Sequence, residues 1–308
     1  MDIICAQERI GGIFRTVVKT DGNFDVEKTF DCGQSFRFDR VEDSIHATEY
    51  SGVAFGRVVS FGQDGDTLYI YNSTEEDFRN IWRAYLGLNV DYREIDDYLL
   101  SRTHSAPFSE AVAYGSGIRI LKQDTEEAIF SFIISQNNNI PRIKQIVERL
   151  SSLCGTPIAV PEEMESHLSG RSSLCAFPSA EALMSLGVDG LFAAKTGFRA
   201  KYIYDAAEKI CSGEFDLGVL EALDSTADGL EYLCRIKGVG PKVASCALLF
   251  SCARFDAFPV DVWIKKAMQK YFPSEDFDPE IFGRYAGVAQ QYLFYYERYL
   301  GGEKVDRL

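Results

Sequence analysis

The spacing of apolar and polar residues changes along the chain and divides it into two parts. Up to about residue 105, short segments rich in β-branched and aromatic residues are separated by Gly and Asp, as at Asp64-Gly65-Asp66. Such segments are typical of β-strands joined by tight turns. They predict an antiparallel sheet whose strands lie around residues 24–30, 35–38, 45–50, 53–61 and 67–72.

Helical spacing replaces this alternation after residue 73. Phe78, Ile81 and Trp82 would share one side of a helix, and from about residue 106 every substantial segment has the same period. Thr125, followed by acidic residues, is a typical helix start. Further helices are expected over 140–150, 179–186, 199–212, 216–223, 228–236, 241–252, 261–271 and 279–299, and residues 155–178 predict a long connection.

These patterns predict an α+β fold with two domains, which the length of 308 residues also favours. The first, residues 1–105, is expected to be an antiparallel β-rich N-terminal domain. The second, residues 106–308, is expected to be helical.

The composition argues against a membrane protein, a disulfide framework and a zinc site. The apolar run 243–250 is far shorter than the roughly 18 residues that span a bilayer, and the N-terminus lacks a basic signal-peptide leader. The eight cysteines form no CxxC pair and the three histidines are isolated. We therefore expect reduced thiols in an intracellular protein, with no metal site and no cofactor.

The net charge of −14 argues against a nucleic-acid ligand, because phosphate binding usually requires Lys and Arg. The charge is uneven, however: residues 235–270 contain seven basic side chains and two acidic ones. A basic surface on an acidic body can attract one polyanionic partner and limit adhesion elsewhere. The charge therefore restricts where nucleic acid could bind and does not exclude it.

The most informative segment is a glycine turn between two expected helices. Gly238, Val239 and Gly240 make a turn that tolerates positive φ and lets another backbone approach closely. Pro241 suits the first turn of the next helix, whose free N–H groups and positive dipole end suit a phosphate. Packing alone is the other role such a turn can have. The apolar residues around it fit two helices packed across the turn, and the whole pattern favours phosphate binding over packing alone.

Two ionisable residues follow this turn. Lys242 lies at a helix start, where the macrodipole disfavours its protonated form, and a neutral lysine amine forms Schiff bases with sugar aldehydes. A phosphate contact is the alternative role of Lys242. Asp261 precedes another expected helix and is a natural N-cap. It could also stabilise positive charge at a breaking glycosidic bond.

These motifs resemble the helix–hairpin–helix DNA glycosylase superfamily, and specifically the 8-oxoguanine DNA glycosylases with β-lyase activity. In that superfamily a GVGxKxA hairpin is followed by a PVD aspartate, as in residues 238–244 and 259–261. Further segments resemble the family in the same order, and the likeness covers nearly the whole chain. They are GQSFR at 33–37, FSFI with the NNN run at 130–142, GFRAKY at 197–202 and YAGVAQ at 285–290.

The resemblance implies a reaction on duplex DNA that contains 8-oxoguanine opposite cytosine. Lys242 would attack C1′ of the damaged nucleotide with the assistance of Asp261, and β-elimination would then nick the strand. Cys246 and Phe294 would sandwich the flipped base, while Gln290 would bind its Watson–Crick edge.

The resemblance also implies how the lesion is recognised and the duplex held. The oxidised base carries a hydrogen at N7, where guanine has an acceptor, and the Gly33 carbonyl would accept from it. Asn137 would fill the vacated space, while Arg142 and Arg199 would hold the orphaned cytosine. Phe198 would wedge into the stack, at a position where the family commonly has Tyr.

Two departures and two alternatives accompany this reading. Trp263 stands where many relatives carry His, and no four-cysteine cluster follows residue 252, which excludes the iron–sulfur cluster of endonuclease III-like relatives. A glycosylase for another purine lesion and a non-catalytic DNA-binding hairpin module remain alternatives. By analogy we expect a monomer, in the cytoplasm or nucleoid of a prokaryote or the nucleus of a eukaryote.

Overall fold

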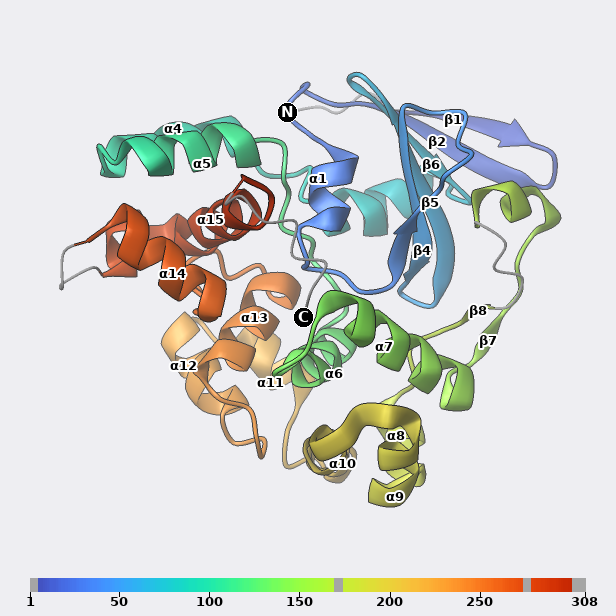
Figure 1. Ribbon diagram of the computed structural model, residues 1–308. Coiled ribbons are helices and arrows are strands. Elements are labelled where there is room, and N and C mark those ends of the chain that lie inside the picture. The colour runs from blue at the N-terminus through green and yellow to red at the C-terminus, as the bar shows by residue number, and fades with distance from the viewer. Residues whose placement is uncertain (1–4, 169–173, 274–277, 301–308) are drawn as a thin grey trace.

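The N-terminal part of the chain is a six-stranded antiparallel sheet (Figure 1). The computed structural model describes residues 5–168, 174–273 and 278–300. The strand order is β1-β2-β6-β5-β4-β3 and every neighbouring pair is antiparallel, which confirms the predicted sheet. The strands are β1 (Cys5–Ile10), β2 (Ile13–Lys19), β3 (Phe38–Arg40), β4 (Thr48–Ala54), β5 (Arg57–Asp64) and β6 (Thr67–Tyr71).

The first predicted strand is wrong. Residues 24–30 contain the helix α1 (Val26–Asp31) instead, because Asp25 caps it: the side chain accepts a hydrogen bond from the backbone N–H of Lys28 at 2.9 Å. Phe30 on α1 is buried against aromatic rings of the sheet. Its apolar spacing therefore reflects one buried helix face and not a strand. The sheet gains two strands, β1 and β2, that were not predicted.

The remainder of the chain is largely helical, as predicted. The α-helices are α2 (Glu75–Asp77), α3 (Arg83–Tyr85), α4 (Tyr92–Arg102), α5 (Ala106–Gly115), α6 (Thr125–Ser135), α7 (Ile140–Cys154), α8 (Ala180–Ser185), α9 (Gly187–Leu191), α10 (Ala200–Ser212), α11 (Leu217–Ala222), α12 (Thr226–Leu233), α13 (Pro241–Ser251), α14 (Val262–Tyr271) and α15 (Ala286–Leu300). Short π-helices cover Phe78–Trp82 and Phe192–Thr196, and a 3₁₀ turn covers Gly197–Arg199.

Two segments differ from the expected elements. The helix expected over 279–299 is divided into a 3₁₀ segment (Pro279–Tyr285) and α15, because Gly283 has φ +51° and interrupts the helical path. The expected connection 155–178 contains a two-stranded ribbon, β7 (Pro157–Ile158) with β8 (Leu174–Cys175), and a 3₁₀ turn (Glu162–His167). None of the helices in the described part of the chain is long and apolar enough to cross a bilayer.

The sheet and the helices have separate cores, and the loop after α1 joins them. Tyr92 and Leu99 of α4 belong to the helical core, whereas Trp82 belongs to the core under the sheet. The domain boundary at residue 105 stays a prediction, and this change of core lies on its N-terminal side. Cys32 and Phe36, in the loop between α1 and β3, also pack in the helical core. Gly33, which lies between these two residues in the loop, is therefore held next to the helical core.

Candidate active site

The glycine turn joins α12 to α13 in a conformation that requires glycine at its first position. Gly238 has φ +81°, and a Cβ there would lie 2.4 Å from the ring of Tyr202. A Cβ on Gly240 would meet no atom within 4 Å, and Gly240 gives α13 no side-chain cap. Val239, between them, is buried in the helical core. The turn thus presents open backbone at a helix N-terminus, which suits a phosphate.

One small cavity brings together the six residues expected to act on the sugar or to bind the base. They reach it from the loop after α1, from α13, from the residue before α14 and from α15, so motifs far apart in the sequence meet at one place. They are Lys242, Asp261, Gly33, Cys246, Gln290 and Phe294.

This cavity is too small to hold a purine as it stands. Its volume is about 70 Å³, far below the roughly 300–1,000 Å³ of ordinary small-molecule sites. A Cβ placed on Gly33 would lie 3.1 Å from Cδ1 of Ile140 and 3.4 Å from Cε1 of Phe294. These two side chains therefore pack against Gly33, and the cavity has to widen before it can hold a base.

Lys242 is partly buried, and an aromatic ring lies near its amine. Its Nζ lies 5.9 Å from the ring centroid of Phe132, and Phe132 stacks on Phe250 with 5.3 Å between ring centroids. Burial raises the pKa of the nearby Cys246 thiol, and Lys242 opposes that rise. The raised pKa favours the protonated thiol, so Cys246 adds no charge to the cavity wall. The nucleophilic form of cysteine is the thiolate.

Asp261 has one oxygen committed to the fold. Its Oδ1 accepts a hydrogen bond from the backbone N–H of Ile264 at 2.8 Å, which confirms the predicted N-cap of α14. The residue also lines the cavity, and its charge reaches the interior because it adds to the raised pKa of Cys246. Capping and an electrostatic role in the cavity are therefore compatible.

Gln290 carries an unused acceptor. The residue is 5% exposed, and its buried Oε1 has no hydrogen-bond partner among the described residues. A buried acceptor without a donor costs about 1–3 kcal/mol. Its position in the cavity wall makes this oxygen available to an N–H group of a bound base.

The residues expected to contact the rest of the DNA form a second group outside the cavity. Asn137, in the turn between α6 and α7, has φ +46°. Arg199 holds this turn: its Nη2 donates to the Asn137 carbonyl at 2.8 Å, and its Nε donates to the Gln136 carbonyl at 2.7 Å. Phe198 is 52% exposed, and Cζ of Arg199 lies over its ring, 4.4 Å from the ring centroid of Phe198.

Arg142 is exposed at the start of α7. Burial lowers the pKa of Arg199, and the nearby charge of Arg142 lowers it further. Arg199 itself is 3% exposed. In the structure its guanidinium group is bound to the backbone carbonyls of Gln136 and Asn137.

Five residues of the cavity wall had no predicted role. They are Cys32, Phe132, Phe250, Pro259 and Gln291. Phe132 and Pro259 lie inside the recognised motifs, and Gln291 adjoins Gln290. For Phe250, which continues an apolar helix, and for Cys32, the sequence carries no signal that separates a cavity wall from core.

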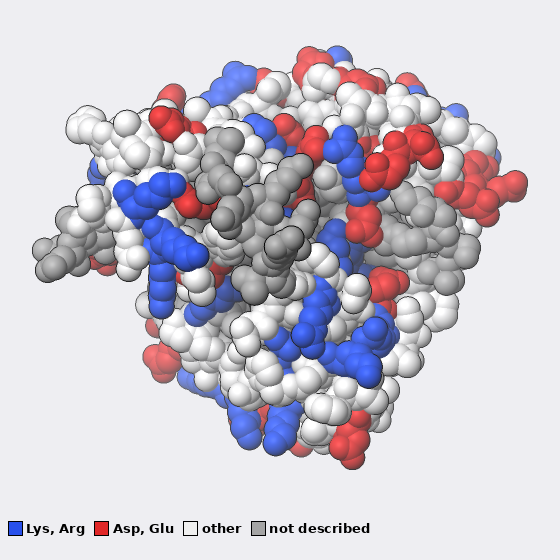
Figure 2. Space-filling view, in the orientation of Figure 1, with Lys and Arg blue, Asp and Glu red and all other residues white. Residues whose placement is uncertain are grey.

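Surface charge is unevenly distributed over the molecule. Figure 2 shows Lys and Arg gathered over α14 and around α7, α10 and α13, whereas Asp and Glu are more frequent over the N-terminal sheet.

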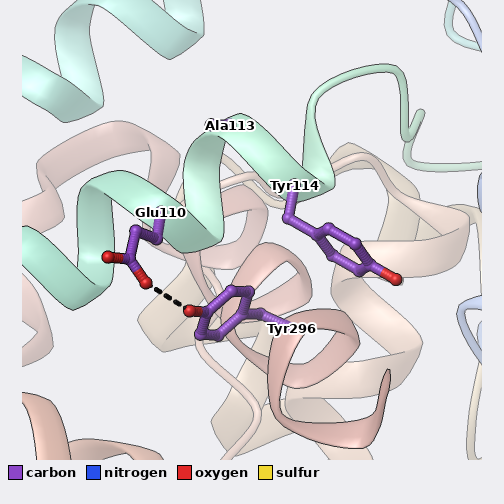
Figure 3. Close-up of a pocket in the computed structure, with 4 residues that line it drawn as sticks. All are labelled: Glu110, Ala113, Tyr114 and Tyr296. Carbon is purple, nitrogen blue, oxygen red and sulfur yellow. Dashed lines mark hydrogen bonds between the residues drawn. The ribbon is translucent and has the colours of Figure 1, made fainter. Parts of the chain in front are cut away.

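A shallow hollow of about 380 Å³ lies between α5 and α15, where Glu110 accepts a hydrogen bond from the Tyr296 hydroxyl at 2.5 Å (Figure 3). It contains none of the predicted site residues. Within the described residues, no cluster of three or more His, Cys, Asp or Glu side chains could hold a metal ion.

Comparison with known proteins gives two family matches and several similar structures. Residues 16–129 match the 8-oxoguanine DNA glycosylase N-terminal domain, and residues 130–285 match the HhH-GPD superfamily of base excision DNA repair proteins. The structure of MBOgg1 in complex with a low-affinity DNA ligand is 40% identical, with a TM-score of 0.85 over 97% of this chain and 99% of that one.

Two further relatives agree with these matches. The Clostridium acetobutylicum 8-oxoguanine glycosylase/lyase, in complex with double-stranded DNA containing cytosine opposite 8-oxoguanine, is 36% identical, with a TM-score of 0.85 over 98% of this chain and 100% of that one. The N-glycosylase/DNA lyase OGG1 of Arabidopsis thaliana is 29% identical over 89% of this chain and 73% of its own. The chain therefore belongs to the HhH-GPD superfamily of base excision DNA repair proteins, and within it to the 8-oxoguanine DNA glycosylases.

Proposed function

We propose that Lys242 is the nucleophile with which this bifunctional glycosylase and lyase removes 8-oxoguanine from duplex DNA. The observation that carries the proposal is the single cavity lined by Lys242, Asp261 and the four residues expected to bind the base. The Lys242 side chain reaches this cavity from the first turn of α13, and a lysine amine forms Schiff bases with sugar aldehydes.

The reaction then follows from ordinary imine chemistry. Nζ of Lys242 bonds to C1′ while the bond from C1′ to N9 breaks, and the base leaves with the electron pair and takes up a proton. Opening of the sugar gives a Schiff base between Nζ and C1′. Loss of a proton from C2′ expels the 3′ oxygen with its phosphate, and water finally releases the lysine. The strand is thereby nicked.

Asp261 acts through its charge. Positive charge develops at the sugar as the glycosidic bond breaks, and a fixed carboxylate stabilises it without having to reorganise. The bond to the backbone of Ile264 at 2.8 Å holds that carboxylate in place. The cap is thus the anchor of the electrostatic group.

Base recognition divides between the two sides of the cavity. Gly33 offers its carbonyl to the N7–H of the oxidised base, and guanine would present an acceptor there and repel it. Gln290 offers its unpaired Oε1 to the opposite edge of the base, while Cys246 and Phe294 take its two faces. Losing one such hydrogen bond costs roughly 1–3 kcal/mol, so extrusion supplies the remaining selectivity.

The duplex is held outside the cavity. The Gly238–Gly240 turn contacts phosphate, and such contacts position the DNA without reading its sequence. Asn137 fills the space left by the flipped nucleotide, Phe198 inserts into the stack, and Arg142 with Arg199 holds the orphaned cytosine. Flipping costs a few kcal/mol, which these void-filling contacts offset.

The proposal assigns every role to residues of a single chain. The protein works as a monomer where the genome lies, in the cytoplasm or nucleoid of a prokaryote or the nucleus of a eukaryote.

Borohydride trapping tests the proposal. We expect wild type to form a covalent adduct with an 8-oxoguanine duplex, because borohydride reduces the Schiff base to a stable amine. Lys242→Gln should form none and should leave the strand intact under single-turnover conditions. Strand cleavage without any adduct in wild type would show that the lysine mechanism is wrong.

Lys237→Gln is the matched control. Lys237 lies in the same hairpin but is exposed, so its loss should weaken DNA binding slightly and leave the adduct. Excision of alkylated purines faster than 8-oxoguanine would favour another purine lesion as the substrate. Binding to damaged duplex with neither adduct nor nick would favour a module that only binds DNA.

A further inference from the structure

We infer that Gln291 is a positioning residue for lesion recognition, because it fixes the peptide that precedes Gly33. The inference rests on the proposed reading of N7–H by the Gly33 carbonyl. The proposed function gives Gln291 of α15 no role, although it lines the cavity; the inference gives it a part in selectivity.

The Gln291 contact is short and buried. Its Nε2 donates to the carbonyl of Cys32 at 2.6 Å, and Gln291 is 3% exposed. Cys32 is 1% exposed, so its carbonyl has little access to water. Removing the donor would leave an unsatisfied buried carbonyl, which favours movement of this peptide.

The other side of Gly33 is held as firmly. Gln34 is fully buried; its Nε2 donates to the carbonyls of Thr29 at 2.8 Å and Arg119 at 2.7 Å, and its Oε1 accepts from the backbone N–H of Leu121 at 2.9 Å. The Gln34 side chain therefore locks the residue that follows the glycine.

The backbone carbonyl of Gln34 is occupied as well. It accepts a hydrogen bond from Nε2 of Gln123 at 2.8 Å. The side-chain amides of Gln291 and Gln123 therefore each donate one hydrogen bond to a backbone carbonyl next to Gly33, on the Cys32 side and the Gln34 side respectively. The Gly33 carbonyl itself receives no donor from the described residues, and Gly33 lines the cavity.

This arrangement explains how one weak contact can discriminate. Gly33 has φ +80°, a conformation that lets the peptide swing in either direction unless its neighbours hold it. A carbonyl that could swing away would escape the repulsion from N7 of guanine and would accept either base. With both flanking carbonyls held, guanine meets a fixed acceptor.

Gln291→Leu tests this assignment by removing the donor while keeping the side-chain size. Two single-turnover rates are measured with the full-length protein: base excision from an 8-oxoguanine:cytosine duplex, and nicking of a preformed abasic site opposite cytosine. The abasic site needs Lys242 but has no base to read. We expect excision to fall about tenfold, the effect of one lost buried hydrogen bond, and abasic nicking to change less than about twofold.

A second readout isolates selectivity. In a Lys242→Gln background, which binds without cutting, the preference for 8-oxoguanine over guanine duplex should fall by a similar factor when Gln291→Leu is added. A purely structural role for Gln291 would lower both affinities together and leave the preference unchanged. Equal loss of excision and abasic nicking would likewise overturn the inference.

Tyr292→Phe is the matched control on the same helix. It removes one partly buried hydrogen bond, from the Tyr292 hydroxyl to Asp96 Oδ1 at 2.7 Å, which does not involve the Gly33 loop. It should leave the ratio of the two rates unchanged, and a change as large as that of Gln291→Leu would overturn the inference. If Gln291→Leu does not fold, Gln123→Leu removes the opposite amide and must lower the same ratio. Wild type inactive on both substrates would mean that the proposed function itself has failed.

Discussion

The carboxylate of Asp261 accepts a hydrogen bond from the backbone N–H of Ile264, with 2.8 Å between Oδ1 and N, at the edge of the cavity that holds Lys242. One side chain thus ends a loop, begins α14 and brings negative charge to the site. Two substitutions separate these roles. Asn also caps helices well, so Asp261→Asn keeps the cap and removes the charge.

We expect Asp261→Asn to lower single-turnover excision by about 10²–10³-fold, as loss of preorganised electrostatic stabilisation does, with little change in the free energy of unfolding. Asp261→Ala should lose a similar amount of rate and also about 1 kcal/mol of stability from the missing cap. Thermal unfolding and single-turnover kinetics measure the two effects. An Asn variant with nearly full activity would remove Asp261 from the mechanism.

Substitutions of the two hairpin glycines should have different effects, one on stability and the other on DNA binding. Gly238→Ala places a Cβ 2.4 Å from the Tyr202 ring at a φ of +81°. We expect it to destabilise the protein by more than about 2 kcal/mol, because steric overlap adds to backbone strain. Chemical denaturation measures this loss.

Gly240→Ala adds a Cβ where no atom lies within 4 Å. It should cost less than about 1 kcal/mol of stability, yet weaken DNA binding at low salt, because a methyl group keeps the phosphate from the open backbone. Equal affinity of Gly240→Ala and wild type for duplex DNA would contradict a phosphate contact at this turn.

The hairpin and the lysine that follows it could be singled out from the sequence because their signals are local. Gly238, Pro241 and Lys242 follow one another, and each is explained by its own backbone position. The N-cap role of Asp261 was readable for the same reason. The family resemblance then identified Gly33, Cys246, Gln290 and Phe294, which line the same cavity although they are far apart in the sequence.

What the sequence did not predict depends on tertiary contacts. The apolar residues of α1 are too few to distinguish a strand from a helix, which is why a strand was predicted there. The N-cap formed by Asp25 favours the helix. No role was predicted for the side chains of Gln291 and Gln34, which are buried and donate to backbone carbonyls. Such partners are fixed only when the loop after α1 packs on α15.

Glu127 should give the stability of the protein a pH dependence. Burial raises the pKa of its carboxyl to about 7, with Arg37 opposing the rise and Asp124 adding to it. A raised pKa means that the folded state favours the protonated form. The stabilisation is therefore complete below the unfolded pKa, near 4.5, and is lost as the pH rises through about 7.

Glu127→Gln removes this titration. Between pH 5 and 8, the free energy of unfolding of the variant should fall less steeply with pH than that of wild type, by at most about 1.4 kcal/mol per pH unit. Glu94→Gln, on an exposed position of α4, is the control and should follow wild type. Parallel curves for wild type and Glu127→Gln would refute the prediction.

Phe198 should matter for the duplex and not for the fold. Its ring is 52% exposed and is held edge-on by Tyr202, with 6.1 Å between ring centroids. Phe198→Ala should therefore cost less than about 1 kcal/mol of stability, as exposed substitutions usually do. An inserted ring offsets part of the unstacking cost of a few kcal/mol, so excision of 8-oxoguanine from duplex DNA should fall at least about tenfold. Phe198→Tyr keeps the ring and serves as the control, with activity near that of wild type. Because a single-stranded abasic site has no stack to open, nicking of that substrate should be the same in all three proteins; a parallel loss there would mean that Phe198 acts on the chemistry and not as a wedge.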